Sequence, residues 1–277
     1  MPGGLLKDQV FIALDLETTG LSAVRDRIVE VAAVKFSLRE GILDTFSNLV
    51  NPQMLIPAVV IGIHGITQAM VADAPVFASL VPALQAFWQD GILLAHNASF
   101  DLAFLACELR RAGFAYPPHP TMDTCRLARI LLPEAPNYKL TTLAAHFDLA
   151  MDGPAHRALP DSRACAELFK LCVSRLPEQA ETPLESFWQH YPGVRNDVMQ
   201  AAVAVDHPLT PPLNLAISQQ QDVKIYYHNA RNERTERVVT PLFLAGRGTF
   251  TYLEAFCHLR QENRQFRLDR MQFLGSA

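Results

Sequence analysis

The sequence has few of the features that mark secreted, membrane or disordered proteins. Charged residues are 19% of the 277 and hydrophobic residues 49%, a balance that supports a sizeable core and excludes a mainly disordered chain. Apolar runs are interrupted by His, Asn, Asp or Glu well before the roughly 18 residues of a membrane span. The N-terminus MPGGLLKDQV lacks the basic and apolar regions of a secretory signal. We therefore expect a cytoplasmic protein with no membrane partner.

Cysteine is sparse and its spacing shows no motif. The chain has five cysteines, an odd number, and no CxxC pair. This argues against a disulfide framework or a zinc cluster, and we expect isolated, buried thiols.

The net charge of −4 is unevenly distributed. Residues 1–210 hold 15 Lys/Arg and 22 Asp/Glu, whereas residues 211–277 hold 9 Lys/Arg and 6 Asp/Glu. An acidic body with a mildly basic end argues against a DNA-coating protein. It is compatible with an enzyme that has carboxylates in its site and a small module that meets anions.

The hydrophobic pattern predicts two domains joined by a linker. Residues 8–175 alternate between predicted strands (10–16, 26–37, 43–50, 91–95) and helices (75–89, 99–112, 123–131, 140–147, 162–175), which indicates an α/β domain with a mixed sheet. Six prolines mark residues 176–212 as a linker with one or two short helices. Residues 213–277 contain four short runs that predict a small all-β barrel: 223–228, 236–244, 249–257 and 264–271.

Two carboxylates end the first predicted strand. Asp15 and Glu17 are two residues apart, so they lie on the same face of the strand. Unpaired like charges beside an apolar strand cost several kcal/mol, and a divalent cation removes that cost. Spacing alone also allows an exposed strand end whose charges are simply solvated.

Three further residues have the chemistry of a hydrolytic site. Asp101 falls in the first turn of the helix after strand 91–95, with Ser99 as its predicted N-cap, although an acidic first turn also suits any helix. His156 and Asp161 are five apart, about 140° around a helix, so they would not share a helical face. Pro160 disfavours helix at Leu159, which places His156 on a loop and Asp161 at the start of the last helix.

Together these residues suggest a two-metal hydrolase. Four carboxylates can hold two Mg²⁺ or Mn²⁺ ions about 3.5–4 Å apart, and oxygen ligands suit these hard cations better than zinc. A histidine close to them supplies a base that titrates near neutral pH.

Three segments resemble the motifs of the DnaQ-like, DEDDh-type 3′–5′ exonucleases: FIALDLETTG, LLAHNASFD and HRALPD. The resemblance covers residues 8–175. Within the family, the three motifs are most similar to those of the proofreading subunit of bacterial replicative polymerases. It implies a ribonuclease H-like fold, a mixed five-stranded sheet flanked by helices. It also implies release of nucleoside 5′-monophosphates from single-stranded or frayed DNA 3′ ends.

The same resemblance implies a role for each motif residue. Asp15 would bridge both metals, and Glu17 and Asp161 would bind the metal that carries the attacking water. Asp101 would support the second metal, and His156 would be the general base.

The resemblance also implies contacts with the terminal nucleotide. Thr18, Thr19 and Gly20 would approach it with backbone groups, and Leu21 would act as an apolar wedge under the terminal base. Other residues that would flank or pack against the nucleotide are Ile63, His64, His96, Asn97 and Phe100, whereas Asp123 is expected to be structural. Each of these residues can also be explained by plain packing or capping.

The C-terminal segment resembles the WYL domain of bacterial regulators. TYLEAFCHLRQENRQFRLDRM and the upstream ERVVTPLFL carry the resemblance over residues 213–277, although Thr251 replaces the Trp that gives the family its name. It implies an Sm/SH3-like barrel that binds nucleic acid or a nucleotide. The candidate ligand surface consists of five arginines, which can equally be the solvated face of a small barrel: Arg247, Arg260, Arg264, Arg267 and Arg270.

Two other functions are compatible with the sequence. An RNA-trimming exonuclease would use the same carboxylates, because DNA and RNA present the same phosphodiester. A WYL-type regulatory protein could use the nuclease fold as a scaffold, although a scaffold has no physical need for clustered carboxylates. Residues 176–212 contain no recognisable clamp-binding or polymerase-binding peptide.

Overall fold

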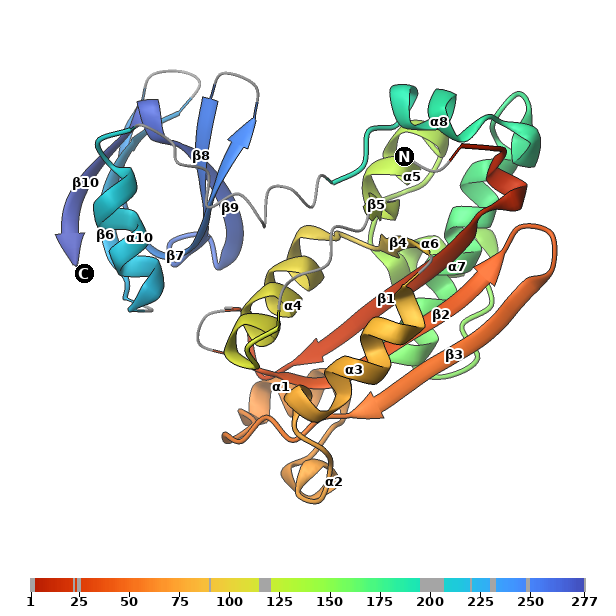
Figure 1. Ribbon diagram of the computed structural model, residues 1–277, viewed down its shortest axis with the longest axis horizontal. Coiled ribbons are helices and arrows are strands. Elements are labelled where there is room, and N and C mark those ends of the chain that lie inside the picture. Colours follow the sequence, from red (N-terminus) through yellow and green to blue (C-terminus); the bar gives the residue numbers. More distant parts are fainter. Residues whose placement is uncertain are drawn as a thin grey trace.

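The computed structural model describes residues 3–276 except 22, 24–25, 90, 115–120, 195–206, 220, 230–232 and 248–249. Its first part, from residue 3 to Val194, is a mixed α/β unit that we call the body. Its second part, from helix α10 (Thr210–Ser218) to the C-terminus, is a small antiparallel sheet with one helix, which we call the C-terminal module. Figure 1 shows the two units beside each other, with helix α4 on the side of the body that faces the module.

The body is built on a five-stranded sheet in the order β3-β2-β1-β4-β5. Strands β1, β2 and β3 pair antiparallel, whereas β4 and β5 run parallel to β1. The strands are β1 (Val10–Thr18), β2 (Ile28–Ser37), β3 (Gly41–Leu49), β4 (Ile92–Ala95) and β5 (Thr121–Asp123). The mixed five-stranded sheet expected from the family resemblance is therefore confirmed. The three-residue β5 escaped the hydrophobic pattern because it is too short to alternate.

Helices cover both faces of the sheet. They are α1 (Ala58–His64), α2 (Gln68–Val71), α3 (Phe77–Trp88), α4 (Ser99–Arg111), α5 (Thr124–Leu131), α6 (Leu140–Phe147), α7 (Ala158–Ser174) and α8 (Leu184–His190), with 3₁₀ turns at Leu6–Asp8 and Gln179–Glu181. Helices α3 and α4 share one hydrophobic cluster with the sheet, and α5 and α7 share the cluster on the other face.

The alternation of β1 decides which residues meet which helix. Leu14 and Leu16 belong to the α3/α4 cluster, whereas Phe11 and Ala13 belong to the α5/α7 cluster. Asp15 and Glu17 continue the odd-numbered series, so they point to the face covered by α7. Above them on that face is the N-terminal turn of α7.

Two helix starts differ from the sequence prediction. Helix α7 begins at Ala158, and Leu159 is helical despite the following proline. Pro160 is the third residue of the helix, where the backbone N–H has no acceptor within the helix, so a proline costs little there. Ser99 is not the N-cap of α4: Ala98 occupies that position, and no side-chain cap is formed. Helices α1 and α2 lie in a segment for which we predicted no element.

The C-terminal module pairs its five strands in the order β10-β6-β7-β8-β9, all antiparallel. They are β6 (Val223–His228), β7 (Arg234–Arg247), β8 (Phe250–Cys257), β9 (Glu262–Arg267) and β10 (Met271–Ser276). The 3₁₀ turn Leu268–Arg270 splits the predicted run 264–271 into two strands. Between the described residues, β9 and β10 remain the sheet edges, so the pairing does not close the predicted barrel. Helix α10 completes the module core with Leu213 and Ala216.

All five cysteines are free thiols. Cys165, Cys172 and Cys257 are buried, and Cys107 and Cys125 are partly buried. Burial raises the pKa of every thiol in the body, so these cysteines stay protonated. The expectation of isolated thiols is confirmed. In the part of the chain that the structure describes, no helix has both the length and the apolar character to cross a bilayer.

Candidate active site

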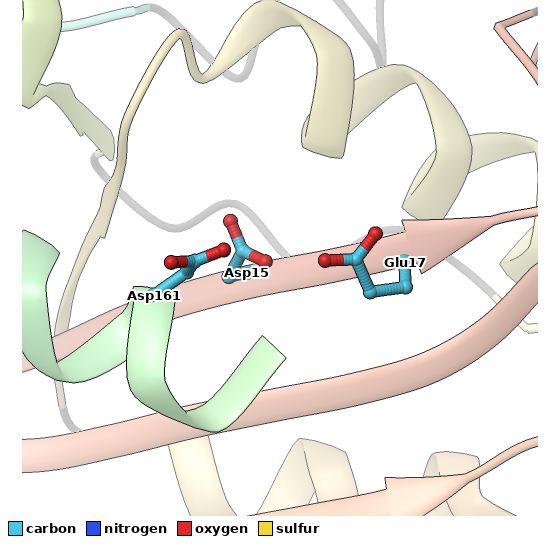
Figure 2. A group of neighbouring side chains, drawn as sticks. All are labelled: Asp15, Glu17 and Asp161. Atoms are coloured by element: carbon cyan, nitrogen blue, oxygen red, sulfur yellow. The ribbon is translucent and has the colours of Figure 1, made fainter. Parts of the chain in front are cut away.

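Three carboxylates meet where β1 ends beneath α7. Asp15 and Glu17 rise from β1, and Asp161 reaches them from the N-terminal turn of α7 (Figure 2). One oxygen from each of the three side chains lies within 4.8 Å of the others, which is a spacing that can hold a metal ion. The structure thus brings together residues that are about 145 positions apart in the sequence.

Asp161 has one oxygen bonded and one free. The backbone N–H of His156 donates to Oδ2 at 2.9 Å. The other oxygen, Oδ1, is buried and has no hydrogen-bond partner among the described residues. An unpaired buried carboxylate oxygen costs free energy, so it marks a place where a cation fits.

Asp101 is the fourth carboxylate of the site. It lies in the first turn of α4 and is 3% exposed. It is not one of the three residues whose oxygens converge, but its charge is the strongest neighbouring charge acting on Asp15. The structure therefore places Asp101 on the border of the cluster.

The carboxylates repel one another in a poorly solvated place. Burial, and then the charges of Asp101 and Glu17, raise the pKa of Asp15 well above its ordinary value. Burial, with the charges of Asp161 and Glu30, raises the pKa of Glu17 to about 8. Burial also raises the pKa of Asp161. The ligand atoms of the site are all carboxylate oxygens, and their mutual repulsion is destabilising without a counter-charge. Both properties suit hard divalent cations such as Mg²⁺ or Mn²⁺.

His156 lies on the loop before α7, as predicted. Its side chain is exposed, and its backbone has φ of 60°, a left-handed conformation that few residues other than glycine adopt. This conformation directs the His156 N–H to Asp161, and the charge of the imidazole acts on that carboxylate. The loop is therefore shaped around the carboxylate cluster.

Glu30 is a site residue that we did not predict. It lies on β2 directly opposite Glu17 and is 3% exposed. Arg157 donates to it from Nε at 3.0 Å and Nη2 at 2.7 Å, and the backbone N–H of Ala158 donates at 2.9 Å. Glu30 thus caps α7 from another strand and fixes the turn that carries Asp161. The available signal was a lone charge in the otherwise apolar stretch 28–34.

The turn after β1 is held by the two predicted threonines. The Thr18 hydroxyl donates to the carbonyl of Gly20 at 2.6 Å, and the Arg27 N–H donates to the Thr19 hydroxyl at 3.0 Å. A side chain at Gly20 would displace the carboxylate of Asp26 from its place beside this turn. The turn presents Leu21, whose side chain is 50% exposed, as a wedge requires.

The other predicted nucleotide contacts divide into exposed and internal side chains. Ile63 and Asn97 are exposed and Phe100 is half-buried, so all three can meet a ligand. His64 is 5% exposed, its Nδ1 accepts from the Ile66 N–H at 3.0 Å, and burial lowers its pKa.

His96 is partly buried, and both of its ring nitrogens have partners. One ring nitrogen is 3.1 Å from the Thr124 hydroxyl and the other 2.8 Å from the carbonyl of Tyr138. With both nitrogens engaged and its pKa lowered by burial, the ring holds the end of β4 against the loop before α6.

Asp123 has the structural role that we expected. Its Oδ1 accepts from the N–H groups of Cys125 at 2.9 Å and Arg126 at 3.3 Å, which makes it the N-cap of α5. The same oxygen accepts from the Asn97 N–H at 3.1 Å. Asn97 has φ of 67°, so the carboxylate holds a strained residue in place just before α4.

The five predicted arginines of the C-terminal module are not equivalent. The Arg247 side chain lies outside the described residues, and Arg267 pairs with Asp269 through bonds of 2.9 and 2.6 Å. Arg260 and Arg264 are exposed around the β8–β9 turn, and Arg264 lies 3.3 Å from Glu262. Arg270 is partly exposed on the 3₁₀ turn.

Comparison with known families matches both units of the chain. A family model described as "Exonuclease" matches residues 12–169, and a model described as "WYL domain" matches residues 208–274. The first range contains all five motif residues of the site.

Two curated relatives each match about three fifths of the chain. DNA polymerase III PolC-type of Oceanobacillus iheyensis is 41% identical over 174 residues, which is 63% of this chain and 12% of the relative. DNA polymerase III subunit epsilon of Treponema pallidum is 39% identical over 171 residues, which is 61% of this chain and 79% of the relative. The chain thus spans 12% of the length of the PolC-type polymerase that it matches.

A solved structure resembles both units. E. coli exonuclease I in complex with a dA16 oligonucleotide matches 90% of this chain and 55% of its own, with a TM-score of 0.56 and 15% identity. At that identity the likeness concerns the fold, and it extends beyond the body into the C-terminal module.

Proposed function

Because this chain belongs to the exonuclease family, we propose that it is a metal-dependent 3′–5′ exonuclease. It would hydrolyse phosphodiester bonds from the 3′ end of single-stranded or frayed DNA and release nucleoside 5′-monophosphates. The observation that carries the proposal is the convergence of Asp15, Glu17 and Asp161, with one buried oxygen of Asp161 unpaired. A protein that used this fold only as a scaffold would gain nothing from such a costly cluster.

Asp15, Glu17 and Asp161, supported by Asp101, would hold two Mg²⁺ or Mn²⁺ ions. When bound, such ions lower the pKa of a water molecule and stabilise the charge that develops on the leaving oxygen. His156 has the exposure and the placement beside Asp161 to accept the proton of the attacking water. The Glu30–Arg157 pair holds the helix turn that carries Asp161.

The terminal nucleotide would lie against Leu21, Ile63, Asn97 and Phe100. Leu21 and Ile63 offer exposed apolar surface on which an unstacked base can pack. A base inside a duplex cannot reach such a surface without unpairing, so single-stranded or frayed ends are the favoured substrates.

We propose finer properties for the C-terminal module as well. Its five antiparallel strands share one hydrophobic core and a 3₁₀ turn joins the last two, which supports an Sm/SH3-like fold. Its exposed arginines support binding of nucleic acid or a nucleotide. We propose an exonuclease domain over 8–175, a linker with short helices over 176–212 and a WYL-like module over 213–277. Helix α8 of this linker packs in the same hydrophobic cluster as α5 and α7 and is therefore part of the body as defined above. The five free thiols support a cytoplasmic location.

The test uses 5′-labelled DNA and RNA single strands of identical sequence, with Mg²⁺, Mn²⁺ or EDTA. We expect a metal-dependent ladder that shortens from the 3′ end, with DNA degraded faster than RNA. Asp15→Ala should abolish cleavage, and Asp73→Ala, at an exposed site away from the cluster, should not. Cleavage by a folded Asp15→Ala protein at the wild-type rate would refute the assignment. Faster degradation of RNA would instead favour an RNA-trimming enzyme with the same site.

A further inference from the structure

One cavity is lined by both units of the protein. Its volume is about 250 Å³, and it lies at the mouth of the proposed nucleotide site. The body contributes residues that we assigned to the terminal nucleotide, and the C-terminal module contributes the β8–β9 turn. The lining residues are Leu21, Asn97, Ser99 and Phe100 from the body, and Gln261 and Glu262 from the module.

A β-bulge holds the module in this position. In the pairing of β7 with β8, Pro241 pairs with Ala255 and Phe243 pairs with Glu254. Leu242 is therefore an extra residue that has no pairing partner on β8. A bulge redirects a side chain and switches the alternation of the strand. Val239 and Leu244 are an odd number of residues apart, yet both pack in the core of the module.

Leu242 packs in the body instead of in its own module. It is 3% exposed and belongs to the hydrophobic cluster of α3, α4 and the sheet. Among the described residues, it is the one member of that cluster from the C-terminal module. Burial of a leucine side chain is favourable because it removes apolar surface from water, so this contact is a specific anchor between the two units.

The charge of the turn suits a nucleic acid strand. Glu262 is compensated by Arg264 at 3.3 Å, and Arg260 is exposed beside them, so the turn carries one net positive charge. Arginine binds phosphate oxygens through two parallel hydrogen bonds. Gln261 and Glu262 line the cavity together with Leu21, and the exposed Arg260 and Arg264 flank these two residues in the sequence. Basic side chains beside a surface on which bases can pack are the combination used by proteins that bind single strands.

We infer that the C-terminal module forms the second wall of the substrate path, with Leu242 as its anchor and the Arg260–Arg264 turn as its contact with single-stranded nucleic acid. The inference rests on the proposed exonuclease function, which it extends to the substrate's form. A wall opposite Leu21 admits one strand and obstructs a duplex. The module then acts in substrate selection, and the reacting groups all lie in the body.

Two substrates separate the wall from the chemistry. The p-nitrophenyl ester of thymidine 5′-monophosphate has a cleavable phosphodiester but no upstream strand. A single-stranded 20-mer and the same strand in a blunt duplex both require the path. Each is measured with the full-length protein in Mg²⁺.

Two module variants test the wall, and a third is the control. Leu242→Asp should release the module, raise KM for the 20-mer about tenfold, the value of one lost base contact, and reduce the preference for single strands over duplexes. Hydrolysis of the ester should keep its rate. Leu274→Asp, an equally drastic change at an exposed leucine of β10, should alter none of these.

Arg260→Ser combined with Arg264→Ser tests the turn without touching the anchor. Loss of two phosphate contacts should reduce the slope of log KM against log salt by about 1.4 for a single strand. Thermal melting of each variant identifies a misfolded protein.

Three outcomes are decisive. A raised KM for the 20-mer with an intact ester rate supports the inference. Unchanged KM, strand preference and salt slope in both folded module variants overturn it. If the wild-type protein cleaves neither ester nor 20-mer, the proposed function itself fails, and the inference fails with it.

Discussion

The metal-free protein should lose stability as the pH rises, because the folded structure disfavours the ionised form of Glu17. Its pKa is raised from an ordinary 4.5 to about 8 by burial and by the charges of Asp161 and Glu30. The folded protein therefore holds a proton that the unfolded chain releases. The stability linked to this proton is fully present below pH 4.5 and is lost as the pH rises to 8.

The size of this effect follows from the two pKa values. One pKa unit corresponds to about 1.4 kcal/mol, and linkage between pH 5 and pH 8 gives a loss of about 3.5 kcal/mol for Glu17 alone. At about 2–4 °C per kcal/mol for a body of this size, the melting temperature should fall by about 7–14 °C. Glu17→Gln keeps the shape of the side chain and removes the titrating group. The melting temperature of this variant should therefore fall less between pH 5 and pH 8 than that of the wild-type protein, by the amount just given.

The measurement is thermal melting in EDTA from pH 5 to pH 8.5, for the wild-type protein, Glu17→Gln and the control Glu178→Gln. Glu178 is exposed, and its substitution should leave the wild-type curve unchanged. The difference between Glu17→Gln and wild type should widen steadily with pH. A constant difference across the range, or a narrowing one, would refute the electrostatic reasoning.

Three other predictions concern the same site. Mg²⁺ or Mn²⁺ at about 100 times its dissociation constant should stabilise the native protein by about 2.7 kcal/mol, seen as a raised melting temperature that Asp15→Asn abolishes. Glu30→Ala should destabilise the protein by about 2–3 kcal/mol in urea unfolding, because Arg157 and the N-terminus of α7 lose their acceptor. His156→Ala should lower kcat by about 10²–10⁴ while leaving the metal-induced rise in melting temperature intact, and equal losses of both would contradict its role as a base.

Local patterns predicted the parts of the site that depend on local geometry. The alternation of β1 placed Asp15 and Glu17 on one face, and the loop position of His156 followed from Pro160 and from the spacing to Asp161. Strands β1, β2 and β3 correspond to the predicted runs 10–16, 26–37 and 43–50. Together with the motif resemblance, these observations were enough for the fold of the body and for its carboxylates.

Long-range contacts explain the remainder. Helix α7 begins earlier than predicted, and its N-terminus is capped by Glu30, a residue 128 positions away. His96 has the look of a ligand-binding residue, yet partners on α5 and before α6 engage both of its nitrogens. The bulge at Leu242 cannot be predicted from its run of apolar residues, because the residues that Leu242 contacts lie in the body.

The buried thiols allow the rate of local opening to be measured separately in each unit. Cys165 and Cys172 lie in the core of the body, and Cys257 in the core of the C-terminal module. None can react with a thiol reagent until its surroundings open, so labelling rates under native conditions report local opening. If the module opens more often than the body, Cys257 should be labelled first. A bound single strand that spans both units should lower the labelling rates in both units.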